Sequence, residues 1–348
     1  MSRESVLMKV NMSVIVCLSG GLIGGASLQA DTSSPDPAVV RSAIEKSILL
    51  LEKTTAGASE HNRCFTCHGH AMPVVTFVEA RRRGFLIDEK NFKAQVKHTL
   101  TDLARGKKRY LEGKGQGGGY TRAGYALWSL RQAGWKPNEV TEYVSGYLVH
   151  DQKAERWPSN GNRPPTERSA FTTTYLALMG VDGFGTVEQA EKIAVRKKKA
   201  LAWLLKSEAK ETEDRVFHLL ALDHLKADQK VVKEAVKALR EAQRKDGGWA
   251  QLPKMESDAY ATGSVLYALY QGGGMKADDA VYQRGVKYLL ETQKEDGSWH
   301  VRSRSMPFQT YYESGYPHKK DQFISMAAGS WASLALLFTI SVEEAVKE

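Results

Sequence analysis

Two copies of one short motif, Gln243-Arg-Lys-Asp-Gly-Gly-Trp249 and Gln293-Lys-Glu-Asp-Gly-Ser-Trp299, stand about fifty residues apart. Each copy follows a charged segment and precedes a segment with few charges. The segments 124–134 and 263–273 also match position for position, with glycine at both ends. A repeating unit of this length is typical of helical-repeat proteins. The repeats therefore predict a chain built from helical hairpins.

Helical periodicity extends over most of the chain, and very little of the sequence alternates with the two-residue period of a strand. Twelve helices are predicted, and they span 37–58, 71–84, 88–112, 119–133, 137–151, 167–180, 186–207, 211–226, 228–244, 257–272, 277–294 and 320–340. Capping residues support several of these ends, such as Asp36 before Pro37 and Gly134 after the fourth helix.

Charge alternates from one predicted helix to the next. The even-numbered helices contain uncharged stretches, which are 124–130, 169–181, 216–222, 259–275 and 324–342. Most odd-numbered helices carry a charge every few residues. A helix that is apolar all round must be buried, whereas an amphipathic helix has one face in water. The alternation predicts an all-α fold, an α/α toroid of about six helical hairpins with inner and outer helices.

The N-terminus has the pattern of a secretory signal peptide. Arg3 and Lys9 precede an uncharged, largely apolar stretch that ends in small residues at Ala30. We therefore expect residues 1–30 to be removed on export, which places the mature protein in the periplasm or outside the cell. Residues 31–345 are expected to form a single toroid domain.

Composition bears on the partners of the chain. Its 348 residues include 49 Lys and Arg and 40 Asp and Glu, a formal net charge of +9. The basic residues are scattered in short groups, as on solvated helix faces, and no nucleic-acid-binding motif is present. No nucleic-acid partner is expected. The uncharged stretch 323–342 is about as long as a bilayer-spanning helix, so membrane association is an alternative to its burial in the toroid.

The sharpest chemical signal is Cys64-Phe-Thr-Cys67-His68, in the first predicted hairpin connection, 59–70. Cys-x-x-Cys-His is the attachment site of a c-type haem, in which both thiols bind the porphyrin covalently and the histidine binds the iron. The motif predicts one covalent haem c. A disulfide between the two cysteines is the main alternative in an oxidising compartment. Half of a zinc site is weaker, because the mature chain has no second cysteine pair.

With Ser257-Asp-Ala-Tyr-Ala-Thr-Gly263 after the first copy, the repeats resemble those of squalene-hopene cyclases and protein prenyltransferases. The resemblance is strong over 228–340 and faint before it. It implies a terpenoid cyclase-like toroid and a structural role, tying outer helices together, for the repeat residues. These residues are Gln243, Trp249, Gln293 and Trp299.

The resemblance does not extend to the chemistry of that family. The chain lacks the Asp-x-Asp-Asp motif with which squalene-hopene cyclases protonate their substrate. The zinc ligands of prenyltransferases include a cysteine, and both mature cysteines here belong to the Cys-x-x-Cys-His motif. The chain resembles instead a group of exported cyclase-repeat proteins that carry a cytochrome c-type motif.

Topology suggests where a second haem ligand could come from. If odd-numbered helices are outer, the odd-to-even connections all lie at one end of the toroid, and ring closure places the first beside the last. The last connection, 295–319, contains His300, Met306 and His318. These three residues and the local His61 are the candidates for the axial position opposite His68.

Two classes of function remain. In the first, the protein is a monohaem electron-transfer or redox-sensing protein with a periplasmic redox partner. In the second, a cyclase-like, polysaccharide-acting or lipid-acting enzyme or binding protein uses the toroid cavity for a small apolar or carbohydrate ligand, with the cysteines as a disulfide. An enzyme would be either a haem-dependent oxidoreductase or a cavity enzyme without the Asp-rich motif. If the cavity is the functional site, the candidates for its acid or base are Glu256, Asp258 and Glu313. The candidates for its aromatic lining are Trp157, Tyr260, Phe308, Tyr311 and Tyr312.

Overall fold

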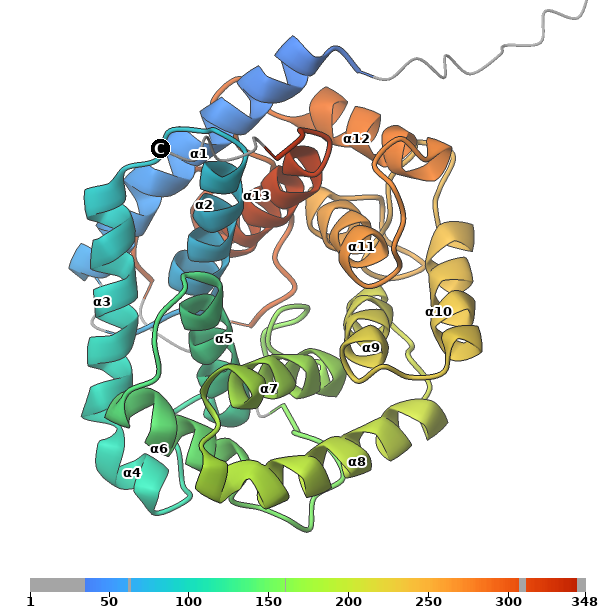
Figure 1. The fold of residues 1–348 in the computed structure, drawn as a ribbon. Helices are drawn as coiled ribbons and strands as arrows, with labels where there is room; N and C mark the ends of the chain where they lie inside the picture. The colour runs from blue at the N-terminus through green and yellow to red at the C-terminus, as the bar shows by residue number, and fades with distance from the viewer. Residues whose placement is uncertain (1–34, 62–63, 160, 307–310, 343–348) are drawn as a thin grey trace, which may run out of the picture. The chain divides into compact units, whose positions relative to one another are not determined.

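Six mostly buried helices form a closed inner ring. They are α2 (Met72–Arg82), α5 (Gly119–Gln132), α7 (Ala170–Phe184), α9 (Thr212–His224), α11 (Ala259–Gln271) and α13 (Gln322–Leu337). Each packs against the next in this order, and α13 packs against α2 (Figure 1). The structure is a computed structural model and describes residues 35–61, 64–159, 161–306 and 311–342, without the side chains of residues 60 and 61.

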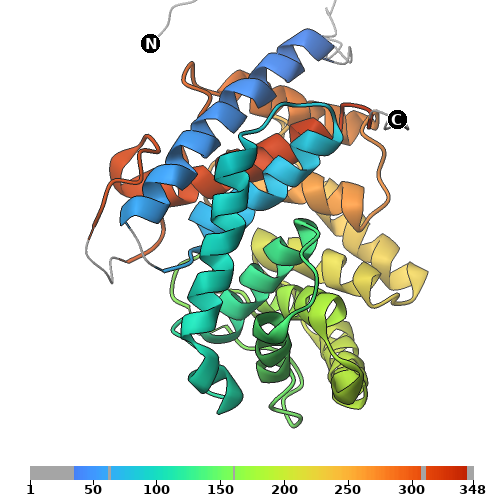
Figure 2. The ribbon, with the colours of Figure 1, turned by 60° about the vertical axis from the view of Figure 1, so that its left-hand side comes forward.

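The outer ring consists of the other α-helices. They are α1 (Pro37–His61), α3 (Glu89–Arg105) with α4 (Lys107–Leu111), α6 (Glu139–Leu148), α8 (Ala190–Lys206), α10 (Gln229–Glu241) and α12 (Ala280–Thr292). Helix α1 lies along α13 and α2, which joins the two ends of the ring (Figure 2). No strand occurs in the described ranges. The predicted all-α toroid of inner and outer helices is confirmed.

The chain divides into two units, residues 1–33 and 34–348, and every described residue belongs to the second. The predicted leader, 1–30, lies outside the described residues. Within the described ranges, no helix is both long and apolar enough to cross a membrane. Helix α13, which holds most of the uncharged stretch 323–342, is instead the most deeply buried inner helix.

Aromatic side chains pack at the centre of the inner ring. The ring of Trp331 on α13 lies 5.0 Å from that of Tyr267, 6.2 Å from that of Phe217 and 6.3 Å from that of Trp128, measured between centroids. These four residues come from four different inner helices, so Trp331 of α13 packs three other inner helices together at the centre of the ring.

Several of the connections that run from an outer helix to the next inner helix meet at one end of the toroid, as the topology predicts. Arg304, in the last connection, donates to Gln251 Oε1 at 3.2 Å and to Glu211 Oε2 at 2.9 Å. Gln251 precedes α11 and Glu211 precedes α9, so three connections are joined here. The Cys-x-x-Cys-His motif lies at the same end, in the connection between α1 and α2.

Candidate functional site

The motif opens a short π-helix, Cys67–Ala71, that leads into α2. Thr66 caps it, because its side-chain oxygen accepts a hydrogen bond from Gly69 N at 3.2 Å. Cys64 is exposed and Cys67 is buried, and no disulfide joins them. The cap therefore fixes Cys67 and His68 in the first turn of this helix, with Cys64 three residues before Cys67.

His68 presents an unpaired nitrogen inside the protein. The residue is only 9% exposed, and its Nε2 has no hydrogen-bond partner. Its ring packs 5.0 Å from that of Phe323, between centroids. Burial, with a smaller contribution from Arg163, lowers the pKa of His68 to about 3. The imidazole is therefore neutral at physiological pH, which is the form that binds metals.

His68 lies on the wall of a cavity of about 350 Å³. The other walls come from the segments 163–167, 303–306 and 320–324, together with Tyr311. The first and last connections of the chain thus enclose one space with the connection that precedes α7. Its volume falls in the range of small-molecule and cofactor pockets.

An ion pair between a buried carboxylate and a partly exposed arginine borders the cavity beside the second cysteine. Arg163 Nη2 lies 2.6 Å from Glu167 Oε2, and the side chain of Glu167 also hydrogen-bonds Cys67. Burial raises the pKa of Glu167, and it raises the pKa of the Cys67 thiol well above its usual range. The thiol therefore keeps its proton and donates it in a hydrogen bond to Glu167.

His70, two residues after His68, has a different role. Its Nδ1 accepts a hydrogen bond from Thr66 N at 3.0 Å, and its Nε2 lies 3.3 Å from Ser59 Oγ. Its ring stacks on that of His98 in α3, with centroids 4.4 Å apart. These contacts tie the motif to α1 and α3.

The candidates for the second axial position are placed differently. Met306 lines the cavity that contains His68, and it is 71% exposed. His300 Nε2 hydrogen-bonds Asp321 Oδ2 at 2.9 Å, and His318 Nε2 hydrogen-bonds Ser298 Oγ at 2.8 Å. The side chain of His61 lies outside the described residues.

The three candidate carboxylates do not converge on one site. Asp258 caps α11, accepting from Ala261 N at 2.8 Å, and burial raises its pKa to about 6. Glu313 is exposed and bonds the hydroxyl of Tyr311, while Glu256 is exposed.

The five aromatic candidates also have different environments. Trp157 and Tyr260 are buried in the core, and Phe308 lies outside the described residues. Tyr311 lines the cavity, and the ring of Tyr312 lies 5.2 Å from that of Phe323, between centroids.

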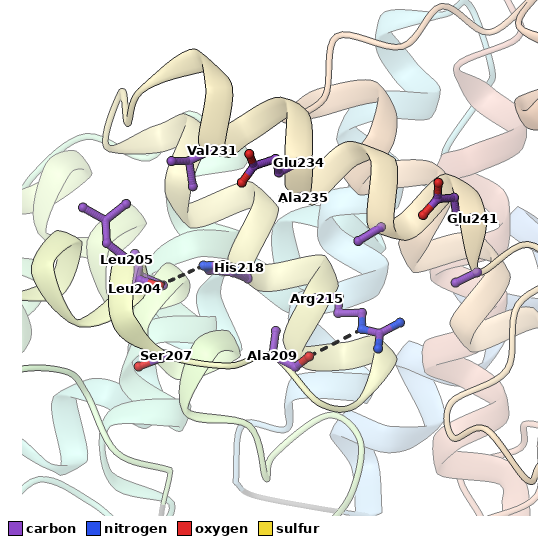
Figure 3. A pocket seen from close by; sticks show the side chains of 12 residues that line it. Leu204, Leu205, Ser207, Ala209, Arg215, His218, Val231, Glu234, Ala235 and Glu241 are labelled. Atoms are coloured by element: carbon purple, nitrogen blue, oxygen red, sulfur yellow. Dashed lines mark hydrogen bonds between the residues drawn. The ribbon is translucent and has the colours of Figure 1, made fainter.

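A larger hollow, about 620 Å³, lies among α8, α9 and α10 on the outer side of the toroid (Figure 3). Two of its polar groups are engaged, since His218 Nε2 lies 3.0 Å from Leu204 O and Arg215 Nε donates to Ala209 O at 3.4 Å. None of the predicted site residues lines it.

Sequence reasoning missed Arg163, Glu167 and the deeply buried Glu213 of α9. No local sequence motif marks these residues. The available signal was that they lie in or near connections between an outer helix and the next inner helix. Among the described residues, no three His, Cys, Asp or Glu side chains group in a way that could hold a metal ion by themselves.

Comparison with known proteins supports the cyclase-like toroid. Residues 181–347 match the squalene-hopene cyclase C-terminal domain. The similar solved structures include the type II terpene cyclase MstE from Scytonema, at 13% identity and a TM-score of 0.56, over 87% of this chain and 98% of that one. A protein from Actinoplanes is 12% identical with a TM-score of 0.56, over 87% of this chain and 100% of that one.

A possible member of the GH105 family from Salmonella enterica is also similar, at 12% identity and a TM-score of 0.51, over 86% of this chain and 93% of that one. No curated protein matches the sequence. At these identities the solved structures share the fold with this chain.

Proposed function

We propose that this chain is an exported c-type monohaem protein whose cyclase-like toroid holds one covalent haem for electron transfer or haem-based redox sensing. The observation that carries the proposal is the Nε2 atom of His68. It is buried, neutral and without a hydrogen-bond partner, and it belongs to a residue on a cavity wall in a motif whose two cysteines form no disulfide. A buried polar atom without a partner is costly, and iron coordination would satisfy it.

The residues present fit a haem. Cys64 and Cys67 would form the two covalent links, and His68 would bind the iron. When bound, the haem supplies one-electron redox chemistry, with a potential that depends on the axial ligands and on burial. Phe323 holds the imidazole of His68 in place, and the ion pair of Arg163 and Glu167 fixes the side chain of Cys67.

Met306 is the residue that we propose for the sixth position. It lines the same cavity as His68, whereas His300 and His318 are each hydrogen-bonded elsewhere. Its exposure supports the proposal that a periplasmic redox partner would approach this edge of the cavity. Export and such a partner belong to the same proposal, because the motif follows the predicted leader.

The proposal is tested by measuring whether the protein carries covalently bound haem. We expect the protein, exported from a host competent for c-type maturation, to give a pyridine haemochrome spectrum and a haem-stained band on a denaturing gel. Cys64→Ser/Cys67→Ser should lose both signals, and Cys17→Ser, in the leader, should keep them. Absence of haem together with a Cys64–Cys67 disulfide would overturn the proposal and favour a cyclase-like cavity protein.

The sixth ligand is tested separately. Met306→Ala should change the low-spin absorption spectrum to that of an iron with an open position, whereas His300→Ala and His318→Ala should leave the spectrum unchanged. A spectrum that is altered by His318→Ala and not by Met306→Ala would contradict the assignment.

A further inference from the structure

Glu213 is a buried carboxyl group that the proposed haem site does not use. It is 4% exposed, on the inner helix α9. Thr172 Oγ donates to its Oε1 at 2.9 Å, and the hydroxyl of Tyr260 donates to its Oε2 at 3.1 Å. Among the described residues, no cationic side chain forms an ion pair with it. A buried carboxylate with only neutral partners is strongly disfavoured, so this group holds a proton readily.

Hydrogen bonds connect Glu213 to the wall of the haem cavity. The hydroxyl of Tyr260 that donates to Glu213 is itself hydrogen-bonded by the side chain of Thr166. Thr166 lines the cavity with His68. Tyr125 donates to Thr166 O at 3.3 Å and lies within electrostatic range of Cys67 and of Glu213. Tyr260 and Thr166 thus form a chain of hydroxyl groups from Glu213 to the cavity that contains His68.

Glu213 also borders a second hollow, of about 220 Å³. Ser169, Arg168, Glu211 and Asp214 line this hollow too. Glu213 thus borders a hollow through which a solvent proton could arrive, and it is also joined to the hydroxyl chain that leads to the haem cavity.

We infer that Glu213 is a proton-binding site coupled to the haem iron, so that reduction of the iron is accompanied by uptake of a proton. One electron from a one-electron reductant reaches the iron, and one solvent proton binds a carboxylate oxygen of Glu213. The added charges cancel inside a region of low dielectric, where an uncompensated charge is costly. This inference rests on the proposed function.

The charges that face Glu213 are consistent with this role. Burial raises the pKa of Glu213 to about 8, and the nearby carboxylates of Asp214, on the same helix, and Glu211, just before it, add to the rise. Tyr260 from α11 and Tyr125 from α5 are neutral at that pH because burial raises the pKa of both well above its usual range. Arg168 lines the same hollow, and Arg304 pairs with Glu211.

The test compares the haem-loaded protein with Glu213→Gln and with Glu52→Gln, a partly buried carboxyl control on α1. In a spectroelectrochemical titration from about pH 6 to 10, the wild type should become harder to reduce as the pH rises. At a fixed applied potential, its reduced-to-oxidised ratio should fall by up to about tenfold per pH unit around pH 8. Glu52→Gln should behave like the wild type, and Glu213→Gln should lose this dependence.

A second readout needs no haem. In the Cys64→Ser/Cys67→Ser background, the stability that Glu213 contributes should be lost as the pH rises from about 4.5 to about 8, because the folded chain keeps a proton on Glu213 that the unfolded chain loses. The free energy of unfolding of this background minus that of its Glu213→Gln variant should therefore fall over that range. A difference that does not change with pH would overturn the proton site, and a pH-dependent difference with an unchanged pH dependence of the potential in Glu213→Gln would overturn the coupling. Absence of covalent haem would defeat the proposed function and the coupling together, while the stability profile would still report the proton site.

Discussion

Three tryptophans, Trp157, Trp249 and Trp299, make the same contact in three hairpins. Each donates its indole N–H to a leucine carbonyl at the end of the preceding outer helix. The acceptors are Leu148, Leu239 and Leu289, at 2.7, 2.8 and 2.8 Å respectively. The contact fixes the outer helix to the connection that follows it. Tryptophan suits this position because it combines a large apolar surface with one polar donor.

Trp249→Phe tests that contact. The change keeps an aromatic ring but removes the donor, which leaves the buried carbonyl of Leu239 without its partner. We expect the free energy of unfolding to fall by about 2 kcal/mol, measured by chemical denaturation. Trp135→Phe, at a site that is 39% exposed, should change it by less than about 0.5 kcal/mol. Equal effects of the two variants would refute the role of the hydrogen bond.

The same residues show what a sequence can reveal. Trp249 and Trp299 stand ten residues after their leucines within a visible repeat, whereas Trp157 stands nine residues after Leu148 and lacks the Gln-x-x-Asp-Gly sequence before it. The sequence therefore predicts Trp157 at the mouth of a cavity. In the structure Trp157 is buried and makes the same indole-to-carbonyl hydrogen bond as the two repeat tryptophans. A one-residue change in a connection hides a repeat that tertiary packing preserves.

Helices α11 and α13 approach each other closely at Gly263. A Cβ atom at this position would lie 2.6 Å from Ala332 N and 2.6 Å from Trp331 C, which are backbone atoms of α13. The two helices can pack at this distance only because the side chain is a single hydrogen. The close approach also holds Trp331 at the centre of the inner ring.

We expect Gly263→Ala to force α11 away from α13 and to lower the free energy of unfolding by about 3 kcal/mol. Gly117→Ala is the matched control, because nothing lies within 4 Å of a Cβ atom there. Thermal unfolding followed by circular dichroism would show the difference. Unchanged melting in Gly263→Ala would mean that the two helices separate without cost.

Although the inner helix α9 carries Glu213, Asp214 and Arg215 near its start, charge alternation predicted the order of inner and outer helices, because a stretch that is apolar all round must be buried. It could not predict the break at Gly106, which divides the expected helix 88–112 into α3 and α4. The Cys64–His68 motif could be found because its chemistry is local. Arg163, Glu167 and Glu213 could not, because only ring closure and the packing of inner helices bring them near the motif.

Two glutamines hold the toroid at different points of its circumference. Gln243 Nε2 donates to Val281 O at 2.8 Å and joins α10 to the adjacent α12. Gln293 Nε2 donates to Ala43 O at 2.9 Å, across a sequence separation of 250 residues, and joins α12 to α1. The same repeat residue thus links neighbouring hairpins in one copy and the two ends of the ring in the other.

Gln293→Ala should therefore loosen the closure of the ring. Hydrogen exchange followed by mass spectrometry should show faster exchange in α1 for Gln293→Ala and unchanged exchange in α1 for Gln243→Ala, with a loss of about 1 kcal/mol of stability in each. Similar exchange of α1 in the two variants would show that the closure depends on other contacts, such as the 2.8 Å hydrogen bond between Ser333 Oγ and Ser47 Oγ.

The cavity beside His68 takes its walls from the beginning, the middle and the end of the chain. During synthesis the Cys-x-x-Cys-His segment emerges long before the segments 303–306 and 320–324 exist. An attachment enzyme would therefore meet the motif as an open peptide, and the toroid would close over an already modified segment. The covalent group would then serve as a template for the last folding step, so that haem attachment would come first and ring closure second.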